Sequence, residues 1–174
     1  MLLCPIQNTA SFSTAWIQKR PRITQKFGEN FRLLSGKLAY TNMDGHNGID
    51  FGLPVGTPIF APCDGFILRK DDKTGYGKHV KIRSREAGKE VVLGHLSNFV
   101  GNDNYIKMVD LIGYSGNTGF STAPHLHFGM RFLQESSANI WAWKVKDHSN
   151  GYFGYIDILP YIITWKGGFL ENDF

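Results

Sequence analysis

The stretch that decides the fold is His125-Leu126-His127-Phe128-Gly129-Met130-Arg131-Phe132. Successive side chains of a β-strand point to opposite faces, so its even and odd positions separate. One face is wholly apolar and holds Leu126, Phe128, Met130 and Phe132. The other face holds His125, His127, Gly129 and Arg131. We therefore predict a half-buried strand that presents two imidazoles to one cleft.

A second stretch, Gly45-His46-Asn47-Gly48-Ile49-Asp50-Phe51-Gly52, has the same design. Its three glycines have low helix propensity, so we expect an extended segment and not a helix. The even spacing then places His46 and Asp50 on one side, with Ile49 and Phe51 directed into a core. We expect Gly48, between the two polar residues, to leave open space.

Short apolar-alternating segments separated by turn signals fill most of the remaining chain. A composition with 20 Gly, 7 Pro and 13 Phe supports β structure over helix. The pattern predicts an all-β fold, an antiparallel sandwich or barrel. Expected strands, besides 125–132, are 59–61, 65–69, 79–84, 90–95 and 111–115.

The length of 174 residues fits one domain with short extensions. We predict a lead-in over residues 1–20 and a core over 21–132. Residues 133–174 are predicted to complete the same domain, and they include a surface insertion up to residue 153. Its aromatic residues, among them Trp141 and Phe153, form either a substrate wall or the buried anchor of the insertion.

Charge and cysteine content narrow the class of protein. The net charge of +4 is spread along the chain, without the basic face of a nucleic-acid-binding protein. Cys4 and Cys63 form no CxxC pair, so a cysteine zinc site is not expected; they are two thiols or one disulfide. We see neither a signal peptide nor an apolar run long enough to span a bilayer.

Both polar faces together offer a carboxylate, Asp50, and three imidazoles, those of His46, His125 and His127. Two neutral imidazoles and one carboxylate form the ligand set of a catalytic zinc site, which keeps a position open for water. Each motif alone is weak: His-x-His arises by chance, and Asn47-Gly48 is also a common hairpin turn. Their conjunction in matching alternating contexts favours a metal site.

These residues resemble the lysostaphin-type, or LytM-like, zinc metalloendopeptidases. Residues 46–50 are similar to the family's HxGxD motif, 125–127 to its HxH motif, and Gly94-His95-Leu96-Ser97 to the segment that supplies a further histidine. The likeness runs from about residue 23 to 132 and resumes over 156–161. Residues 105–110 depart from it, because they lack the family's glycine-rich turn.

The resemblance implies antiparallel sheets in a barrel-sandwich-like domain with a substrate groove. It implies one Zn²⁺ per chain held by His46, Asp50 and His127, with His95 and His125 as catalytic residues beside it. Tyr40 occupies a position where some members carry a tyrosine thought to assist the oxyanion. The implied substrate is the peptide part of bacterial peptidoglycan, either stem or cross-bridge, hydrolysed by a metal-activated water.

Two other functions remain open at this point. One is a non-catalytic relative that binds cell wall; the complete set of five site residues favours the active enzyme. The other is a structural protein of a phage particle on the same fold, which the missing signal peptide allows. We expect a monomer that acts at the cell wall, with no nucleic-acid partner.

Overall fold

The structure, a computed structural model, describes residues 2–3 and 22–163. Within these residues there is no α-helix, only two short 3-10 segments, η1 (Ile140–Ala142) and η2 (Leu159–Tyr161). Strands make up the rest of the regular structure, and all but one of their pairings are antiparallel. The all-β prediction is therefore confirmed.

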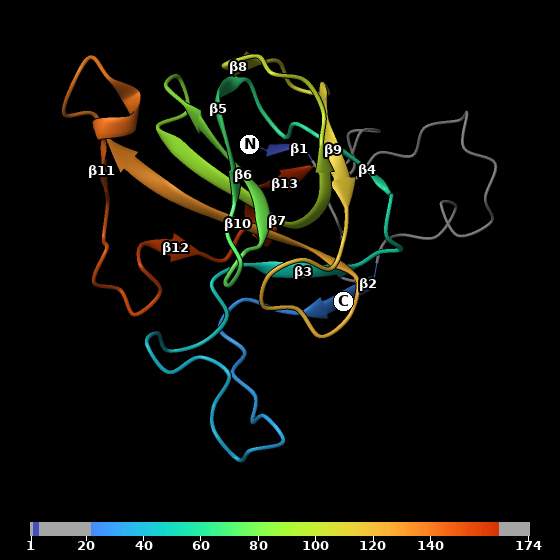
Figure 1. The fold of residues 1–174 in the computed structure, drawn as a ribbon. Helices are drawn as coiled ribbons and strands as arrows, with labels where there is room; N and C mark the ends of the chain where they lie inside the picture. The colour runs from blue at the N-terminus through green and yellow to red at the C-terminus, as the bar shows by residue number, and fades with distance from the viewer. Residues whose placement is uncertain (1, 4–21, 164–174) are drawn as a thin grey trace.

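The main sheet has the strand order β2-β3-β10-β7-β6-β5-β8 (Figure 1). Its two edges, β2 and β8, do not pair with each other, so the sheet stays open. The strands are β2 (Arg22–Gln25), β3 (Ile49–Gly52), β5 (Gly65–Asp71), β6 (Lys78–Ser84), β7 (Lys89–Phe99), β8 (Tyr105–Ile106) and β10 (His125–Gln134).

Shorter strands attach to this sheet. The pair β4 (Pro58–Phe60) and β9 (Leu111–Ser115) joins through the second half of β7. Two further strands, β11 (Lys144–Val145) and β12 (Tyr155–Ile156), pair with the end of β10. A separate parallel pair consists of β1 (Leu2–Leu3) and β13 (Ile162–Ile163).

The expected strands all form, with ends shifted by a few residues. The largest difference concerns β7, which does not end at His95 but continues to Phe99. There it changes partners: residues up to Gly94 pair with β10, and residues from Leu96 pair with β9. His95 marks the bend and has a positive φ of 61°.

Alternation on the central strands builds the core. Leu126, Phe128 and Met130 of β10 are fully buried, and Phe132 is packed against them. Ile49 and Phe51 of β3 are also buried, on the same face of the sheet as these β10 residues. The core lies between this face and an outer layer that contributes Ile59, Ala61, Ile112 and Ile158. The opposite face of β3, β10, β7 and β6 is left to carry polar side chains.

Residues 133–163 return to the main sheet through β11 and β12. A second apolar cluster of Leu133, Ile140 and Trp143 anchors this segment. The division into residues 1–20, 21–132 and 133–174 stays a prediction, and most of the lead-in, Cys4 included, lies outside the described residues. The described part of the chain contains no helix with the length and hydropathy needed to cross a bilayer.

Candidate metal centre and active site

A cleft of about 590 Å³ opens on the polar face of the sheet. Its floor is formed by β3 and β10, and its walls come from three loops. One is the long loop between β2 and β3, which projects from the sheet (Figure 1). The others are the β5–β6 turn at Thr74–Tyr76 and the segment Phe120–Thr122 before β10. Phe153 and Tyr155 close one end.

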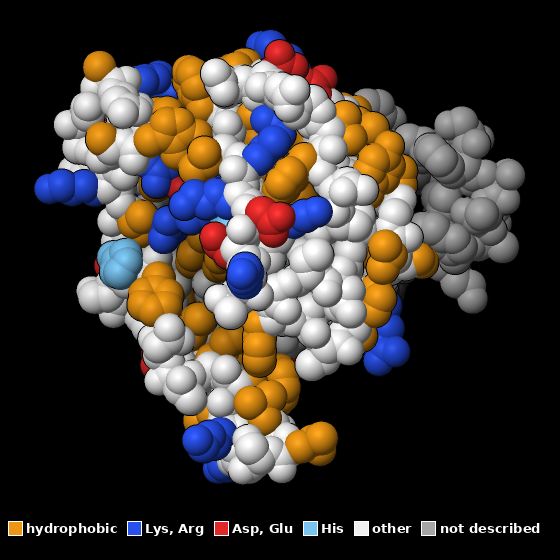
Figure 2. Space-filling model, in the orientation of Figure 1, with side chains coloured by type: hydrophobic (Ala, Val, Ile, Leu, Met, Phe, Trp, Pro, Cys, Tyr) orange, Lys and Arg blue, Asp and Glu red, His pale blue; other side chains and the backbone are white. Residues whose placement is uncertain are grey.

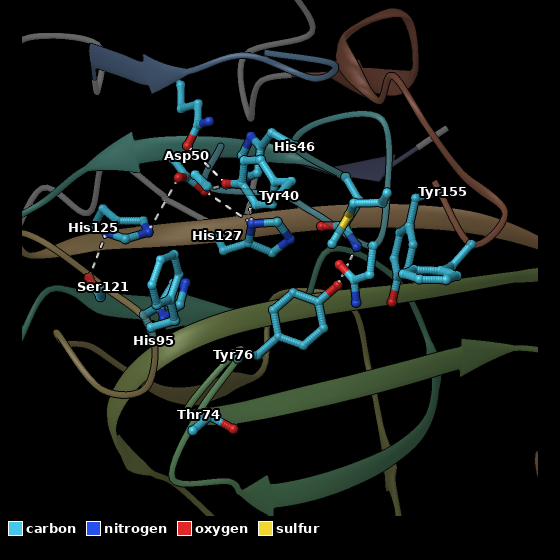
Figure 3. A pocket seen from close by; sticks show the side chains of 18 of the residues that line it. Tyr40, His46, Asp50, Thr74, Tyr76, His95, Ser121, His125, His127 and Tyr155 are labelled. Carbon is cyan, nitrogen blue, oxygen red and sulfur yellow. Dashed lines mark hydrogen bonds and ion pairs between the residues drawn. The ribbon is translucent and has the colours of Figure 1, made fainter. Parts of the chain in front are cut away.

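The structure brings His46, Asp50 and His127 together on the cleft floor (Figure 3). Asp50 and His127 are direct cross-strand partners on β3 and β10. His46 lies in the loop just before β3, not on the strand, and reaches the same point from the side. All three residues are buried.

Their polar atoms form a nearly equilateral triangle. His46 Nε2 lies 2.9 Å from His127 Nδ1. Asp50 Oδ1 lies 3.1 Å from the former and 3.0 Å from the latter. Zinc bonds of about 2.0–2.1 Å in tetrahedral directions separate ligand atoms by roughly 3.3 Å. The donor set and its spacing therefore fit a catalytic zinc ion held by three protein ligands.

A backbone contact sets the tautomer of His46. Its Nδ1 lies 3.1 Å from the carbonyl oxygen of Lys26 and, as the only possible donor of that pair, carries the proton. Nε2 then presents a lone pair to Asp50 and His127. Such an outer hydrogen bond orients a ligand histidine and raises its basicity.

The carboxylate of Asp50 is held in its charged form, although the residue is buried. Burial alone would raise the pKa of Asp50, but the imidazoles of His127 and His46 beside it hold this pKa below its usual range. Burial lowers the pKa of His127, against the opposing effect of Asp50. An anionic oxygen of Asp50 beside the His127 imidazole, which favours the neutral form, is a protonation pattern that suits metal ligation.

His95 faces the triangle from β7. Its Nδ1 donates to the carbonyl oxygen of Thr118 at 2.7 Å, so Nε2 is the nitrogen that can accept a proton. Burial is the largest effect on the pKa of His95 and lowers it to about 4. The left-handed backbone at His95 is unusual for a residue with a side chain, and such backbone strain is concentrated at functional sites.

His125 stands beside His95, with 4.4 Å between the ring centroids. Its Nδ1 donates to the carbonyl oxygen of Ala123 at 2.7 Å and lies 3.1 Å from Ser121 Oγ. Its Nε2 lies 3.3 Å from Asp50 Oδ2, the carboxylate oxygen that is outside the triangle. His95 and His125 thus flank the three clustered residues without belonging to their triangle.

Gly48 does not leave open space, contrary to expectation. A β-carbon at this position would lie 2.6 Å from His127 Cε1 and 2.7 Å from the carbonyl oxygen of Phe128. The imidazole of His127 therefore occupies the room that the missing side chain provides. The glycine of the HxGxD pattern permits the two motifs to approach each other.

Tyr40 lines the cleft next to His46, and its ring stacks on that imidazole at 5.7 Å between centroids. Its hydroxyl donates to Gln25 Oε1 at 3.1 Å. Burial and the charge of Asp50 raise its pKa above the usual range, so the phenol stays a proton donor at neutral pH.

Sequence reasoning did not assign site roles to Tyr76 and Tyr155. Tyr76 packs against His127 with 4.9 Å between centroids and accepts a hydrogen bond of 2.7 Å from Asn47 Nδ2. Tyr76 stands in a Gly-Tyr-Gly turn that the family resemblance already includes, whereas nothing in the local sequence marks Tyr155.

The aromatic residues of the insertion divide between two roles. Trp143 is buried in the second apolar cluster and serves as an anchor. Phe153 lines the cleft. His79, which had no expected site role, is buried outside the triangle, with its Nδ1 2.9 Å from the carbonyl oxygen of Gly77.

Comparison with known proteins decides the family. The sequence pattern of peptidase family M23 matches residues 44–139, which is more than half of the chain and includes all five predicted site residues. The chain belongs to peptidase family M23. The resemblance to lysostaphin-type metallopeptidases is thereby confirmed.

Individual M23 relatives agree with this assignment. The chain is 44% identical over 86 residues, 49% of its length, to the DD-carboxypeptidase/endopeptidase Mpg of Neisseria meningitidis. That alignment covers 20% of Mpg, so the chain matches only about a fifth of this relative.

Solved M23 structures have the same fold. The catalytic domain of lysostaphin from Staphylococcus simulans superposes with a TM-score of 0.60 at 26% identity, covering 81% of this chain and 91% of that domain. The catalytic domain of the prophage-encoded M23 protein EnpA from Enterococcus faecalis gives a TM-score of 0.53 at 29% identity. It covers 63% of this chain and 79% of that one. The fold of this M23 chain is therefore that of the lysostaphin-type domains.

Proposed function

We propose that this chain is a zinc-dependent endopeptidase that hydrolyses peptide bonds in the stem or cross-bridge of bacterial peptidoglycan. The observation that carries the proposal is the triangle of His46 Nε2, Asp50 Oδ1 and His127 Nδ1, with its edges of 2.9 to 3.1 Å. Membership of M23, and relatives named as endopeptidases, support the reaction class.

In this proposal the three clustered residues hold one Zn²⁺ per chain. When bound, zinc supplies Lewis-acid chemistry, which activates water and polarises the scissile carbonyl. The protein supplies the ligand orientation, through the Lys26 carbonyl behind His46 and the glycine beside the ring of His127.

His95 and His125 are the proposed proton carriers. Each donates Nδ1–H to a backbone carbonyl, which leaves Nε2 of each neutral ring without a proton; in His125 this nitrogen lies 3.3 Å from Asp50 Oδ2. A neutral imidazole in that tautomer accepts a proton at Nε2 and returns it to a leaving amine. The low pKa of His95 keeps it in this neutral form at pH 7.

The peptide is proposed to lie along the cleft between the loop after β2 and the wall formed by Phe153 and Tyr155. The protein would act on the cell wall as a monomer, with peptidoglycan peptide as its partner.

The test is digestion of purified peptidoglycans with different cross-bridges, followed by quantification of new amino termini. We expect release by the zinc-loaded protein, no release after chelation, and recovery when zinc is returned. Arg85→Ala, a change at an exposed ion pair outside the cleft, serves as the matched control and should digest like wild type. Full zinc content with no release from any wall would favour the cell-wall-binding function instead.

A further inference from the structure

The end of the cleft away from His125 carries an excess of positive charge. Lys81 of β6 pairs with Val92 of β7, which in turn pairs with Gly129 of β10. Gly129 lies two residues beyond His127 on the same face of its strand. With about 3.3 Å per residue and 4.8 Å per strand, the Cα of Lys81 lies roughly 12 Å from that of His127.

The next cross-strand row is a buried ion cluster of Arg83, Glu90 and Arg131. Arg83 Nε donates to Glu90 Oε2 at 2.6 Å, and Arg131 Nη2 lies 2.7 Å from Glu90 Oε1. Arg83 also donates to the carbonyl oxygen of Ile140, and Arg131 donates to that of Phe153. Glu90 is therefore fully engaged by the two guanidinium groups.

Lys81 is the neighbouring cation that has no acidic partner among the described residues. It lines the cleft and is half-buried, yet its ammonium makes no hydrogen bond or ion pair with any residue of 2–3 or 22–163. Burial lowers its pKa; the charge of Glu90 opposes this effect, and Arg131 adds to it. Three cations and one carboxylate therefore give these two neighbouring rows a net charge of +2, which an incoming anion would reduce.

Neighbouring groups shape this end for a peptide. The guanidinium of Arg131 lies over the ring of Tyr155, 4.8 Å from its centroid, and this contact holds the Tyr155 ring in place at the end of the cleft. The labelled hydroxyl groups of Tyr76 and Tyr155 lie on the side of His127 opposite to His125 (Figure 3). Lys and Arg side chains also gather on the surface over β5 and β6 (Figure 2). The cleft thus leads from the triangle to a cationic end.

We propose that Lys81 binds a carboxylate of the peptide substrate, three to four residues from the bond that is cut. An extended peptide advances about 3.3 Å per residue, so roughly 12 Å corresponds to that separation. The proposal rests on the peptidase function proposed above. It makes Lys81 a specificity-determining residue that distinguishes acidic peptides from amidated ones.

The test compares a synthetic peptidoglycan stem peptide carrying free carboxylates with the same peptide in which they are carboxamides. Binding is measured by titration calorimetry on zinc-loaded protein with His95→Ala, so that the peptide is not consumed. We expect about fivefold tighter binding of the carboxylate peptide, as for a partly exposed ion pair. Adding Lys81→Met should abolish this preference, and adding Lys81→Arg should restore most of it.

Lys70→Met is the matched control, because Lys70 is an exposed cation on the neighbouring strand, opposite His79. It should keep the preference. Equal binding of both peptides by the parent protein, or equal loss in the Lys70 and Lys81 variants, would overturn the proposal. In the active protein, Lys81→Met should raise KM for the carboxylate peptide and leave kcat nearly unchanged.

Two failures are distinguishable in this design. A carboxylate preference without release of amino termini contradicts the peptidase function and leaves the Lys81 site standing. Cleavage of both peptides with the same KM contradicts the Lys81 site and leaves the peptidase function standing.

Discussion

A β-carbon on Gly48 would lie 2.6 Å from Cε1 and 2.8 Å from Nε2 of His127. Contacts this short are not tolerated. The new methyl group could not move away from the ring either, because the carbonyl oxygen of Phe128 lies 2.7 Å from the same β-carbon. Gly48→Ala should therefore push the imidazole away from Asp50 and weaken zinc binding by about tenfold or more. Competition with a chromophoric zinc chelator measures this affinity.

Gly52→Ala is the control for that change. Gly52 ends β3, the short strand that begins just after Gly48, and its added methyl would meet only the Thr24 side chain closely, at 2.8 Å. Normal zinc affinity in both variants would show that the position of the His127 ring does not depend on Gly48.

Zinc content should separate the proposed metal ligands from the proposed proton carriers. His46→Ala, Asp50→Ala and His127→Ala each remove one corner of the triangle, so we expect loss of zinc and activity together. His95→Ala and His125→Ala should keep one zinc per chain and lose turnover by a factor of about 10²–10⁴. Mass spectrometric metal analysis, beside the digestion assay, makes the comparison.

His148→Ala is the histidine control for the metal analysis, because His148 lies away from the triangle and should have no effect on zinc content. A His95→Ala protein without metal would contradict this division of roles.

Glu90→Gln should destabilise the fold strongly. It removes the one negative charge between Arg83 and Arg131, and breaking a buried ion cluster in this way costs about 3–5 kcal/mol. The exposed pair of Arg85 and Glu135 provides the comparison: Arg85→Ala should cost at most about 1 kcal/mol. Urea unfolding at pH 7 measures both.

The effect of Glu90 should also depend on pH. Burial would raise its pKa, but the charges of Arg131 and Arg83 hold it below the ordinary value of 4.5. Because the folded pKa is the lower one, the stabilisation is present above pH 4.5 and is lost as pH falls through the folded value. The stability difference between wild type and Glu90→Gln should therefore shrink below pH 4.5; a constant difference would contradict the assignment.

Val109 is strained by its left-handed backbone, with φ at 77°. This conformation costs a residue with a β-carbon about 1–2 kcal/mol. Val109→Gly should remove that cost and lose about 0.5–1 kcal/mol through chain entropy, for a net gain of about 0.5–1 kcal/mol. Calorimetry should show a Tm higher by about 2–3 °C.

Val55→Gly is the matched change at an exposed valine without positive φ, and it should lower Tm. A lower Tm for Val109→Gly as well would mean that contacts of the valine outweigh its strain.

Much of the fold follows from alternation, because the period of two at Leu126, Phe128 and Met130 fixes which face is buried. Once that face is set, His127 and Asp50 must point the other way, and antiparallel pairing places them opposite each other. The bend of β7 at His95 could not be predicted, since it depends on a switch of partners between β10 and β9. Val109 belongs to the segment where sequence reasoning noted a missing glycine turn, and the strain is its physical consequence.

Residues that reach the site over long separations were the hardest to predict. Tyr155 enters the cleft because β12 pairs with β10, and no local pattern records that pairing. The space at Gly48 was predicted as empty because the sequence shows which side chain is missing but not which neighbour fills its place. Lys81 has an unremarkable local sequence, and only the register across three strands brings it into line with the histidines.

The row of Arg83, Glu90 and Arg131 bears on the engineering of hybrid enzymes. Arg83 and Arg131 donate to carbonyl oxygens at Ile140 and Phe153, so the C-terminal segment is fastened to side chains that belong to the core strands. A chimaera that receives residues 133–163 alone would lack these two hydrogen bonds, because Arg83 and Arg131 lie outside that segment. Transplanting the cleft wall formed by Phe153 and Tyr155 into another protein therefore requires Arg83, Glu90 and Arg131 to be moved with it.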